Sequence, residues 1–237
     1  MSAVHVSHTT PTAHTPGLLA RHLQEWLGAW PADGAGVTVV GSPRRSRPGW
    51  DGLVHDVIGV ATPHRAVLSV PVDKAEAIAG LVRGDDLDAD IAALSAGMSA
   101  VMGRRGVISR GLFRWSLSPS DFPDAGEWVP TDDPRVPPWL KPFNGDLLIA
   151  WDDDGHYGAG VGRKMHDDFG HELSVGTEES LRGRGIGRAL VATVARRVLS
   201  DGKVPTYLHA PDNHASAKVA DAAGFPDVGW RVLGFWD

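Results

Sequence analysis

The stretch RGRGIGR, residues 182–188, lies between two segments of clear and different periodicity. Residues 171–176 alternate in the manner of a strand, and residues 185–200 repeat apolar side chains at helical spacing. A helix amino terminus presents unpaired backbone N–H groups and the positive end of the helix dipole. A strand, a glycine-rich loop and a helix in this order therefore predict an anion-binding site where the helix begins.

The composition of this loop fits a pyrophosphate. Glycines let an anion approach the backbone, and arginines add charge and forked hydrogen-bond donors. The residues expected to bind it are Arg182, Gly183, Arg184, Gly185, Ile186, Gly187 and Arg188. A nucleotide P-loop would need Lys at 188, and a dinucleotide fingerprint would need Gly there. The competing interpretation is a solvated basic loop or an RG-type nucleic-acid contact.

The overall composition excludes several classes of protein. The chain has 237 residues, 42% of them hydrophobic, and a formal net charge of −6 at pH 7. A net acidic surface has no general attraction for nucleic acid or anionic membrane, so neither is expected as a partner. The chain contains no cysteine, which removes disulfides, thiolate nucleophiles and cysteine-ligated zinc.

The amino-terminal residues give no sign of targeting. Residues 1–16 are polar and lack the basic start and apolar core of a signal peptide. No apolar run approaches the ~20 residues that a membrane helix needs. We therefore expect a cytoplasmic protein with a flexible tail over residues 1–16.

Two regions follow the tail, with a boundary near residue 120 at the start of a proline-rich stretch. Residues 17–120 predict a mixed α/β region that carries no motif of recognisable chemistry. Its expected helices cover residues 18–30, 74–82 and 86–102, and its expected strands cover residues 36–40, 55–61, 65–72 and 107–116. Residues 117–145 are interpreted as linker.

Residues 121–237 form the second region, and its periodicity is clearer. Strands are expected at residues 146–151, 157–164, 171–176, 204–209 and 230–236. Helices are expected at residues 185–200 and 215–223, the second closed by Gly224. The acidic residues 152–154 are expected to form a hairpin turn.

Two motifs in this region resemble those of the GNAT acetyltransferase superfamily, including its actinobacterial-type group. The family's acetyl-CoA motif is Arg or Gln, two residues, Gly, one residue, and Gly or Ala. Its next helix often starts with Asn, followed by a small residue, Tyr and Gly-Phe at fixed intervals. The matching residues are Arg182, Gly185 and Gly187 for the first motif and Asn213, Ser216, Gly224 and Phe225 for the second.

The resemblance covers residues 126–237 and implies a fold and a reaction. The implied fold is the α/β GNAT acyl-CoA N-acyltransferase fold, a mixed central sheet flanked by helices. Residues 17–120 would be an α/β extension, either a degenerate GNAT-like half or a lid. The implied reaction is direct transfer of an acetyl group from acetyl-CoA to a primary amine, with the backbone of Val175 polarising the thioester carbonyl and Asn213 among the cofactor-binding residues.

One departure from the family pattern concerns the leaving group. The family's tyrosine, which protonates the CoA thiolate, is replaced here by Ala220. Ser216 is a candidate donor to the thiolate or a helix cap, and Tyr207 is a candidate acid or a core residue. The loop between Val175 and Arg182 is also two residues longer than the common family pattern.

The general base is expected on one of the two strands next to the thioester. Glu172 is the first candidate, with a structural ion pair as the alternative, and His209 is the second, with a structural histidine as the alternative. Strand alternation puts Glu172 and His171 on opposite faces, so only one of them can face the site. His166 and His171 are further candidates to line the acceptor cleft.

The sequence leaves three functions open. The first is an N-acetyltransferase acting on a small-molecule or protein amine, with acetyl-CoA as co-substrate and no metal. The second is a catalytically weak CoA-binding regulator, which the loss of tyrosine at position 220 favours. The third is a partner-binding module whose loop holds another anion. A homodimer is a possible assembly for any of them.

Overall fold

The computed structural model describes residues 16–236, so the predicted tail over residues 1–16 lies outside the described residues except for its last member. No helix among residues 16–236 is both long and apolar enough to cross a membrane. The helices are α1 (Gly17–Leu27), α2 (Ala75–Ala79), α3 (Leu87–Met102), α4 (Ile186–Ser200) and α5 (His214–Ala223), with short 3₁₀ turns at Pro43–Ser46, Val72–Lys74, Pro138–Leu140 and Glu179–Leu181.

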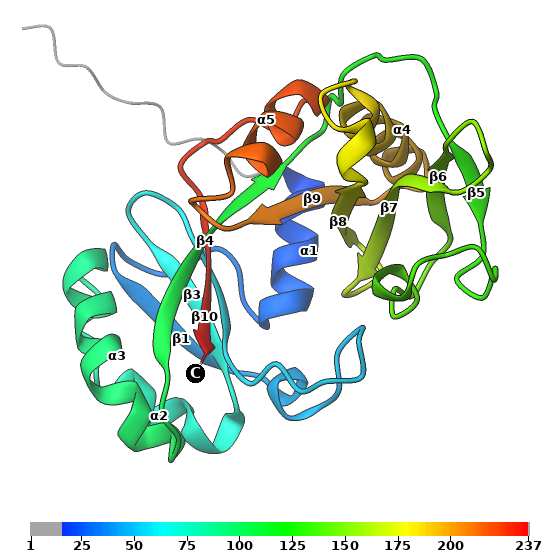
Figure 1. The fold of residues 1–237 in the computed structure, drawn as a ribbon. Helices are drawn as coiled ribbons and strands as arrows, with labels where there is room; N and C mark the ends of the chain where they lie inside the picture. Colours follow the sequence, from blue (N-terminus) through cyan, green and yellow to red (C-terminus); the bar gives the residue numbers. More distant parts are fainter. Residues whose placement is uncertain (1–15, 237) are drawn as a thin grey trace, which may run out of the picture.

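The strands of residues 16–236 form one mixed sheet (Figure 1). They are β1 (Val37–Gly41), β2 (Ile58–Ala61), β3 (Ala66–Val70), β4 (Val107–Trp115), β5 (Glu127–Val129), β6 (Leu147–Trp151), β7 (Tyr157–Met165), β8 (Gly170–Thr177), β9 (Val204–His209) and β10 (Arg231–Trp236). Their order is β1-β3-β2-β10-β4-β9-β8-β7-β6-β5. Within this sheet β1 and β3 are parallel, as are β8 and β9, and the other pairs are antiparallel.

Helices cover both faces of this sheet, which confirms the expected α/β class. Leu173 and Tyr207 pack against α4 and α5 in one core cluster. Phe113 and Val67 face the opposite way and pack with α1. Leu233 lies on the α4 and α5 face, in a core that includes α2 and α3. α1 therefore lies alone on one face of the sheet, and the other described α-helices lie on the opposite face.

The two helices that border the expected cofactor site owe their positions to local sequence signals. Gly185 precedes α4 with φ of 79°, a left-handed conformation that glycine adopts without strain. Asn213 caps α5, because its side-chain oxygen accepts a hydrogen bond of 3.0 Å from the N–H of Ser216. Gly224, again left-handed, ends α5.

Two expectations need correction. Residues 117–145 are not only linker: they include the edge strand β5, which pairs with β6, and a 3₁₀ turn at Pro138–Leu140. A three-residue edge strand is too short to show alternation, and the surrounding prolines conceal it. The first helix ends at Leu27 and not at residue 30, because left-handed Gly28 closes it.

Strand pairing links the two predicted regions closely. β4, from the amino-terminal side of residue 120, lies between β9 and β10, from the carboxyl-terminal side. β10 in turn pairs with β2. Figure 1 shows β10, in red, running into the amino-terminal half of the molecule. The boundary near residue 120 stays a prediction, and it would separate β4 from both of its neighbours.

Candidate functional site

The two central parallel strands separate part-way along their length. β8 and β9 pair over the segments Gly170–Leu173 and Val204–Tyr207. Beyond this level β8 continues alongside β7 only, and His209 of β9 pairs with Leu112 of β4. The separation opens the sheet between β8 and β9, where side chains from both faces of the sheet can meet.

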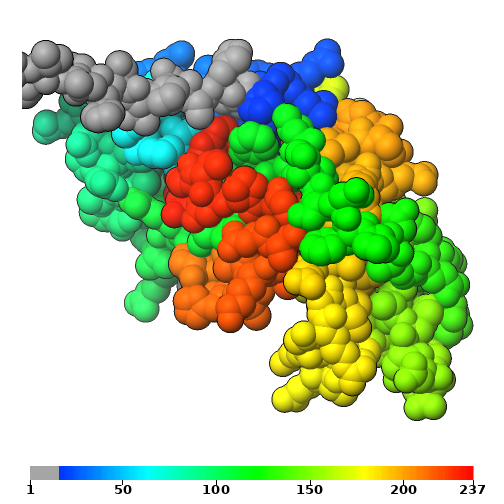
Figure 2. All heavy atoms as spheres, turned by 90° about the horizontal axis from the view of Figure 1, so that it is seen from above, coloured from blue at the N-terminus to red at the C-terminus, as the bar shows by residue number. Residues whose placement is uncertain are grey.

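A groove of about 710 Å³ lies on the α4 and α5 face at this opening. Its lining comprises Val175, Gly176, Thr177, Leu181, Arg182, Gly183, Gly185, Ile186, Gly187, Arg188, Asn213, Ala215, Ser216, Lys218, Val219 and Ala222. Figure 2 shows the yellow loop segment and the orange α5 segment side by side, with an indentation between them. The predicted cofactor residues all line this groove except Arg184, which is exposed outside the lining.

The loop before α4 concentrates positive charge at the groove. Arg182 donates from Nε to the carbonyl of Thr177 at 3.1 Å, and Arg188 lies 5.1 Å from the centre of the Phe122 ring. Among residues 16–236 no carboxylate forms an ion pair with Arg182, Arg184 or Arg188. The first N–H groups of α4 also lack intrahelical partners by geometry. The groove therefore offers both charge and backbone donors to an anion.

At the other wall of the groove, Ser216 is tied to the core. Its Oγ lies 2.8 Å from the hydroxyl oxygen of Tyr207. Tyr207 is 1% exposed, and this burial raises the pKa of its hydroxyl. Ala220 lies in the same core cluster as Tyr207 and is fully buried. The tyrosine hydroxyl on this side of the groove thus comes from β9 and not from α5.

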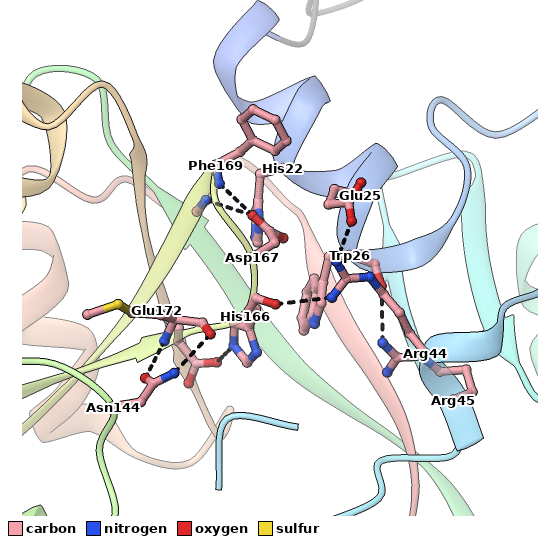
Figure 3. A network of polar contacts seen from close by, with 12 residues as sticks. His22, Glu25, Trp26, Arg44, Arg45, Asn144, His166, Asp167, Phe169 and Glu172 are labelled. Carbon is pink, nitrogen blue, oxygen red and sulfur yellow. Dashed lines mark hydrogen bonds and ion pairs between the residues drawn. The ribbon is translucent and has the colours of Figure 1, made fainter. Parts of the chain in front are cut away.

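A second hollow, of about 370 Å³, lies between the two predicted regions and is called the aromatic cleft here. Its lining comprises Trp26, Trp50, His55, Ile58, Ser109, Gly111, Lys164, His166, Glu172, Leu208, His209, Val232, Leu233, Gly234 and Trp236. Glu172 and His209, the two candidate bases, both line it. Figure 3 shows α1 above this region, with Trp26 beside His166.

Glu172 is held by two basic side chains in the cleft (Figure 3). Its carboxylate pairs with the ammonium of Lys164 at 2.5 Å and with Nε2 of His166 at 2.9 Å. Burial acts to raise the pKa of Glu172, but Lys164 and His166 outweigh it and lower the pKa to about 2. A carboxylate with so low a pKa is a weak proton acceptor, and it holds the Lys164 and His166 side chains in place.

His209 has one ring nitrogen engaged and one free. Nδ1 lies 2.8 Å from the carbonyl oxygen of Ala210, which can only accept, so Nδ1 carries a proton. Nε2 is buried and has no hydrogen-bond partner among the described residues. In the neutral ring this nitrogen holds a lone pair. His209 also shares the strand face of Tyr207, whose ring centre is 6.2 Å away and whose hydroxyl contacts Ser216 in the groove.

Comparison with known proteins agrees with this geometry. Residues 112–225 match the profile of the Acetyltransferase (GNAT) family. The chain carries a GNAT acetyltransferase domain. The matched segment begins within β4.

Several solved structures resemble this chain. A GNAT-family acetyltransferase from Novosphingobium aromaticivorans is 22% identical over 55% of this chain and 66% of its own length, just under two thirds, with a TM-score of 0.47. A GCN5-related N-acetyltransferase from Kribbella flavida is 16% identical over 94% and 96% of the two chains, with a TM-score of 0.46. No curated protein sequence matches the chain.

Of the two further candidate histidines, only one lines a hollow of the described residues. His166 lines the aromatic cleft, whereas His171 lines neither hollow. His171 is 2% exposed and has no hydrogen-bond partner among the described residues. Burial, aided by the positive charges of Lys203 and Arg163, lowers its pKa to about 4. His171 is thus a buried neutral residue on the face opposite Glu172.

The turn between β6 and β7 lies outside both the groove and the aromatic cleft. Asp152, Asp154 and His156 bring ligand atoms within 4.8 Å of one another there. The Asp152 carboxylate accepts from the backbone N–H groups of Asp154 and His156 at 3.0 and 2.8 Å. These bonds belong to the predicted hairpin turn, as expected for a turn aspartate.

Sequence reasoning missed three of the residues that complete the aromatic cleft. Trp26 and Trp50 come from α1 and from the loop before β2, and Lys164 comes from β7. The only sequence signal was the density of aromatic residues in a region without motifs. Their convergence depends on the packing of α1 against the sheet, which no local pattern shows.

Proposed function

We propose that this GNAT enzyme transfers the acetyl group of acetyl-CoA directly to a primary amine. The observation that carries the proposal is the position of His209, which lines the aromatic cleft and lies 6.2 Å from the Tyr207 ring, whose hydroxyl contacts Ser216 in the basic groove. The groove would hold acetyl-CoA and the cleft the amine. The opening between β8 and β9 would let the two reactants meet.

The groove fits the pyrophosphate of coenzyme A. Arg182 and Arg188 would neutralise its charge, and the N–H groups around Gly185 and Gly187 would bind its oxygens. A side chain at Gly185 would meet the Arg188 guanidinium, 2.9 Å from the position of an added Cβ. Glycine at 185 therefore keeps this approach to the backbone open.

The catalytic step divides between the two strands. The amine nitrogen attacks the thioester carbonyl carbon, and Nε2 of His209 takes the proton that the amine loses. Val175 lies on the segment of β8 that no longer pairs with β9, and its backbone N–H would stabilise the oxyanion. As the carbon–sulfur bond breaks, the hydroxyl of Ser216, hydrogen-bonded to Tyr207, would stabilise the thiolate.

Glu172 has an electrostatic role in this scheme. Because its pKa is lowered to about 2, the Glu172 carboxylate is a weak proton acceptor, and the unpartnered Nε2 of His209 is the candidate base. Glu172 holds Lys164 and His166 at the wall of the cleft. The amino-terminal half then acts as a lid, since it supplies Trp26 and Trp50 to the same cleft.

A catalytically weak CoA-binding regulator is the alternative function, and one observation favours it. Ala220 stands where the family has its acid, and the replacement hydroxyl of Tyr207 is buried behind Ser216. Turnover separates the two functions. We expect acetyl-CoA with a panel of primary amines to give thiol release and acetylated amine, both detected in the same reaction, at rates well above hydrolysis. Binding of acetyl-CoA without acetylated product from any amine would favour the regulator.

A further inference from the structure

The aromatic cleft continues into a second hollow of about 740 Å³, called the arginine recess here. The two hollows share Trp26, Trp50, His55, Ile58 and His166. The recess adds the charged residues Glu25, Arg44, Arg45 and Arg47. An elongated ligand can therefore reach from His209 in the cleft to the arginines in the recess.

Arg45 is the central feature of the recess, and its charge has no counter-ion. Its side chain donates from Nη1 to the carbonyl of His55 and from Nη2 to the carbonyl of Trp26, each at 3.1 Å. Its Nε is buried without a partner, and no ion pair within residues 16–236 includes it. Arg45 is only 5% exposed. Burial, together with the neighbouring Arg44, lowers its pKa to about 10.

The carboxylates around the recess are already engaged. Glu25 pairs with Arg44, as Figure 3 shows, and Asp51 pairs with His55 at 3.0 Å. Asp56, whose negative charge acts to raise the pKa of Arg45, pairs with Arg104 at 2.9 Å. Arg47 is exposed and forms no ion pair with any described residue. The recess thus has three arginines and one glutamate, in a protein of net charge −6.

A buried cation without a counter-ion is costly and rare, so such a charge next to a hollow indicates an anionic ligand. We propose that the acetyl acceptor is a small amine that also carries a carboxylate or phosphate, bound by Arg45 and Arg47 while its amine reaches His209. The placement of the amine end rests on the proposed function, whereas the binding of the anionic group rests on the recess alone. The hydrocarbon chain or ring of this acceptor would lie against Trp26 and Trp50.

The transfer test compares matched amines. 4-(Aminomethyl)benzoate differs from 4-methylbenzylamine only in its carboxylate, and 2-aminoethyl phosphate differs from 2-methoxyethylamine chiefly in its phosphate. Because a hydrogen bond to a charged group contributes 1.5–3 kcal/mol, we expect at least about a tenfold higher kcat/KM for the acid of one pair. The pair with the larger ratio distinguishes carboxylate from phosphate.

A binding test does not depend on transfer. 4-Methylbenzoate, added to the protein saturated with CoA, should raise the Tm, whereas 4-methylbenzamide should not. Arg45→Met should abolish the shift. Arg47→Gln, at an exposed side chain that forms no ion pair with any residue of 16–236, should weaken it without affecting the fold. Arg105→Gln makes the same charge change at an exposed position outside the recess and should leave the shift unchanged.

The outcomes separate the two proposals. Equal effects of 4-methylbenzoate and 4-methylbenzamide on the wild type would overturn the anion site. So would a benzoate shift that survives both Arg45→Met and Arg47→Gln. Benzoate binding that depends on the recess, in a protein that acetylates none of the amines, would support the anion site and count against amine transfer. Acetylation of 4-methylbenzylamine at the same rate as 4-(aminomethyl)benzoate would support amine transfer and count against an anionic acceptor.

Discussion

His209 and Glu172 line the same cleft, yet their surroundings fit them for different work. His209 keeps one nitrogen free because the carbonyl of Ala210 engages only the other. Glu172 has both oxygens engaged, one by Lys164 and one by His166. A proton acceptor needs a free lone pair and a suitable pKa, whereas an electrostatic anchor needs fixed partners. We therefore assign the role of general base to His209 and the role of electrostatic anchor to Glu172.

Replacing His209 tests this division. His209→Gln retains a polar side chain but removes the imidazole, so kcat should fall by about 10²-fold or more for any amine the wild type acetylates. Acetyl-CoA affinity should stay unchanged, since His209 lines the cleft and not the groove. Steady-state kinetics and calorimetry measure the two quantities. His64→Gln, at an exposed histidine outside both hollows, is the control. An unchanged kcat and pH–rate profile in His209→Gln would exclude His209 as the base.

His171 predicts a pH dependence of stability. Its pKa is about 4 in the folded protein against 6.5 for an ordinary histidine side chain, so the unfolded chain binds more protons between these values. The free energy of unfolding should therefore fall as pH drops from 6.5 to 4, by roughly 3 kcal/mol from this residue. Glu172 has a lowered pKa and loses its contribution only below about 4.5, so the range from pH 6.5 to 4.5 isolates His171.

Urea unfolding of the wild type and His171→Gln between pH 6.5 and 4.5 measures this slope. The variant should show a shallower fall in the free energy of unfolding, whatever its absolute stability. His64→Gln removes an exposed histidine and should keep the wild-type slope. A slope in His171→Gln as steep as that of the wild type would contradict the assignment.

At the scale of elements, the sequence predicted most of the structure around α4 and α5. The loop at residues 182–188 and the cap at Asn213 are local signals, so the helices begin within one residue of the predicted positions. β5 was missed because three residues show no periodicity. The aromatic cleft could not be foreseen, because Trp26, Trp50 and His209 are brought together only by the packing of distant segments. Likewise, nothing in the sequence indicated that Arg45 is buried without a counter-ion.

The Asn213 cap gives a prediction at this scale. Its side-chain oxygen accepts the hydrogen bond from the N–H of Ser216, so Asn213→Ala should lower the free energy of unfolding by about 1 kcal/mol. Loosening this turn should also weaken acetyl-CoA binding, since Asn213 and Ser216 both line the groove. Lys218→Ala, exposed on the same helix and also at the groove, is the control for stability. Equal stabilities of the two variants would contradict the cap.

At the scale of the molecule, one sheet joins regions that the sequence suggests are separate. β4 lies between β9 and β10, and β10 also pairs with β2. Phe113 of β4 packs with α1 residues and with Trp230, which precedes β10. The aromatic cleft takes its walls from both regions. Activity should therefore require both regions, and unfolding should be shared between them.

Fragments test this continuity. Residues 121–237 lack β4, so β9 would present an open edge and β10 would have no partner among its own residues. We expect this fragment to show no cooperative thermal transition, because an exposed central edge and an unpaired strand favour aggregation. Calorimetric melting and circular dichroism provide the measurement, with the whole chain as reference. Cooperative unfolding of the fragment together with acetyl-CoA binding would instead support a boundary near residue 120.

The most direct test of the central claim is a calorimetric titration of the whole chain with acetyl-CoA. The loop before α4 should bind it with a Kd in the micromolar range, and Gly185→Glu should abolish binding by placing a carboxylate and a side chain where the pyrophosphate belongs. Gly202→Glu introduces the same side chain at another left-handed glycine, one with open space around it, and should bind normally. Absence of binding by the folded wild type, or equal binding by Gly185→Glu, would contradict the account.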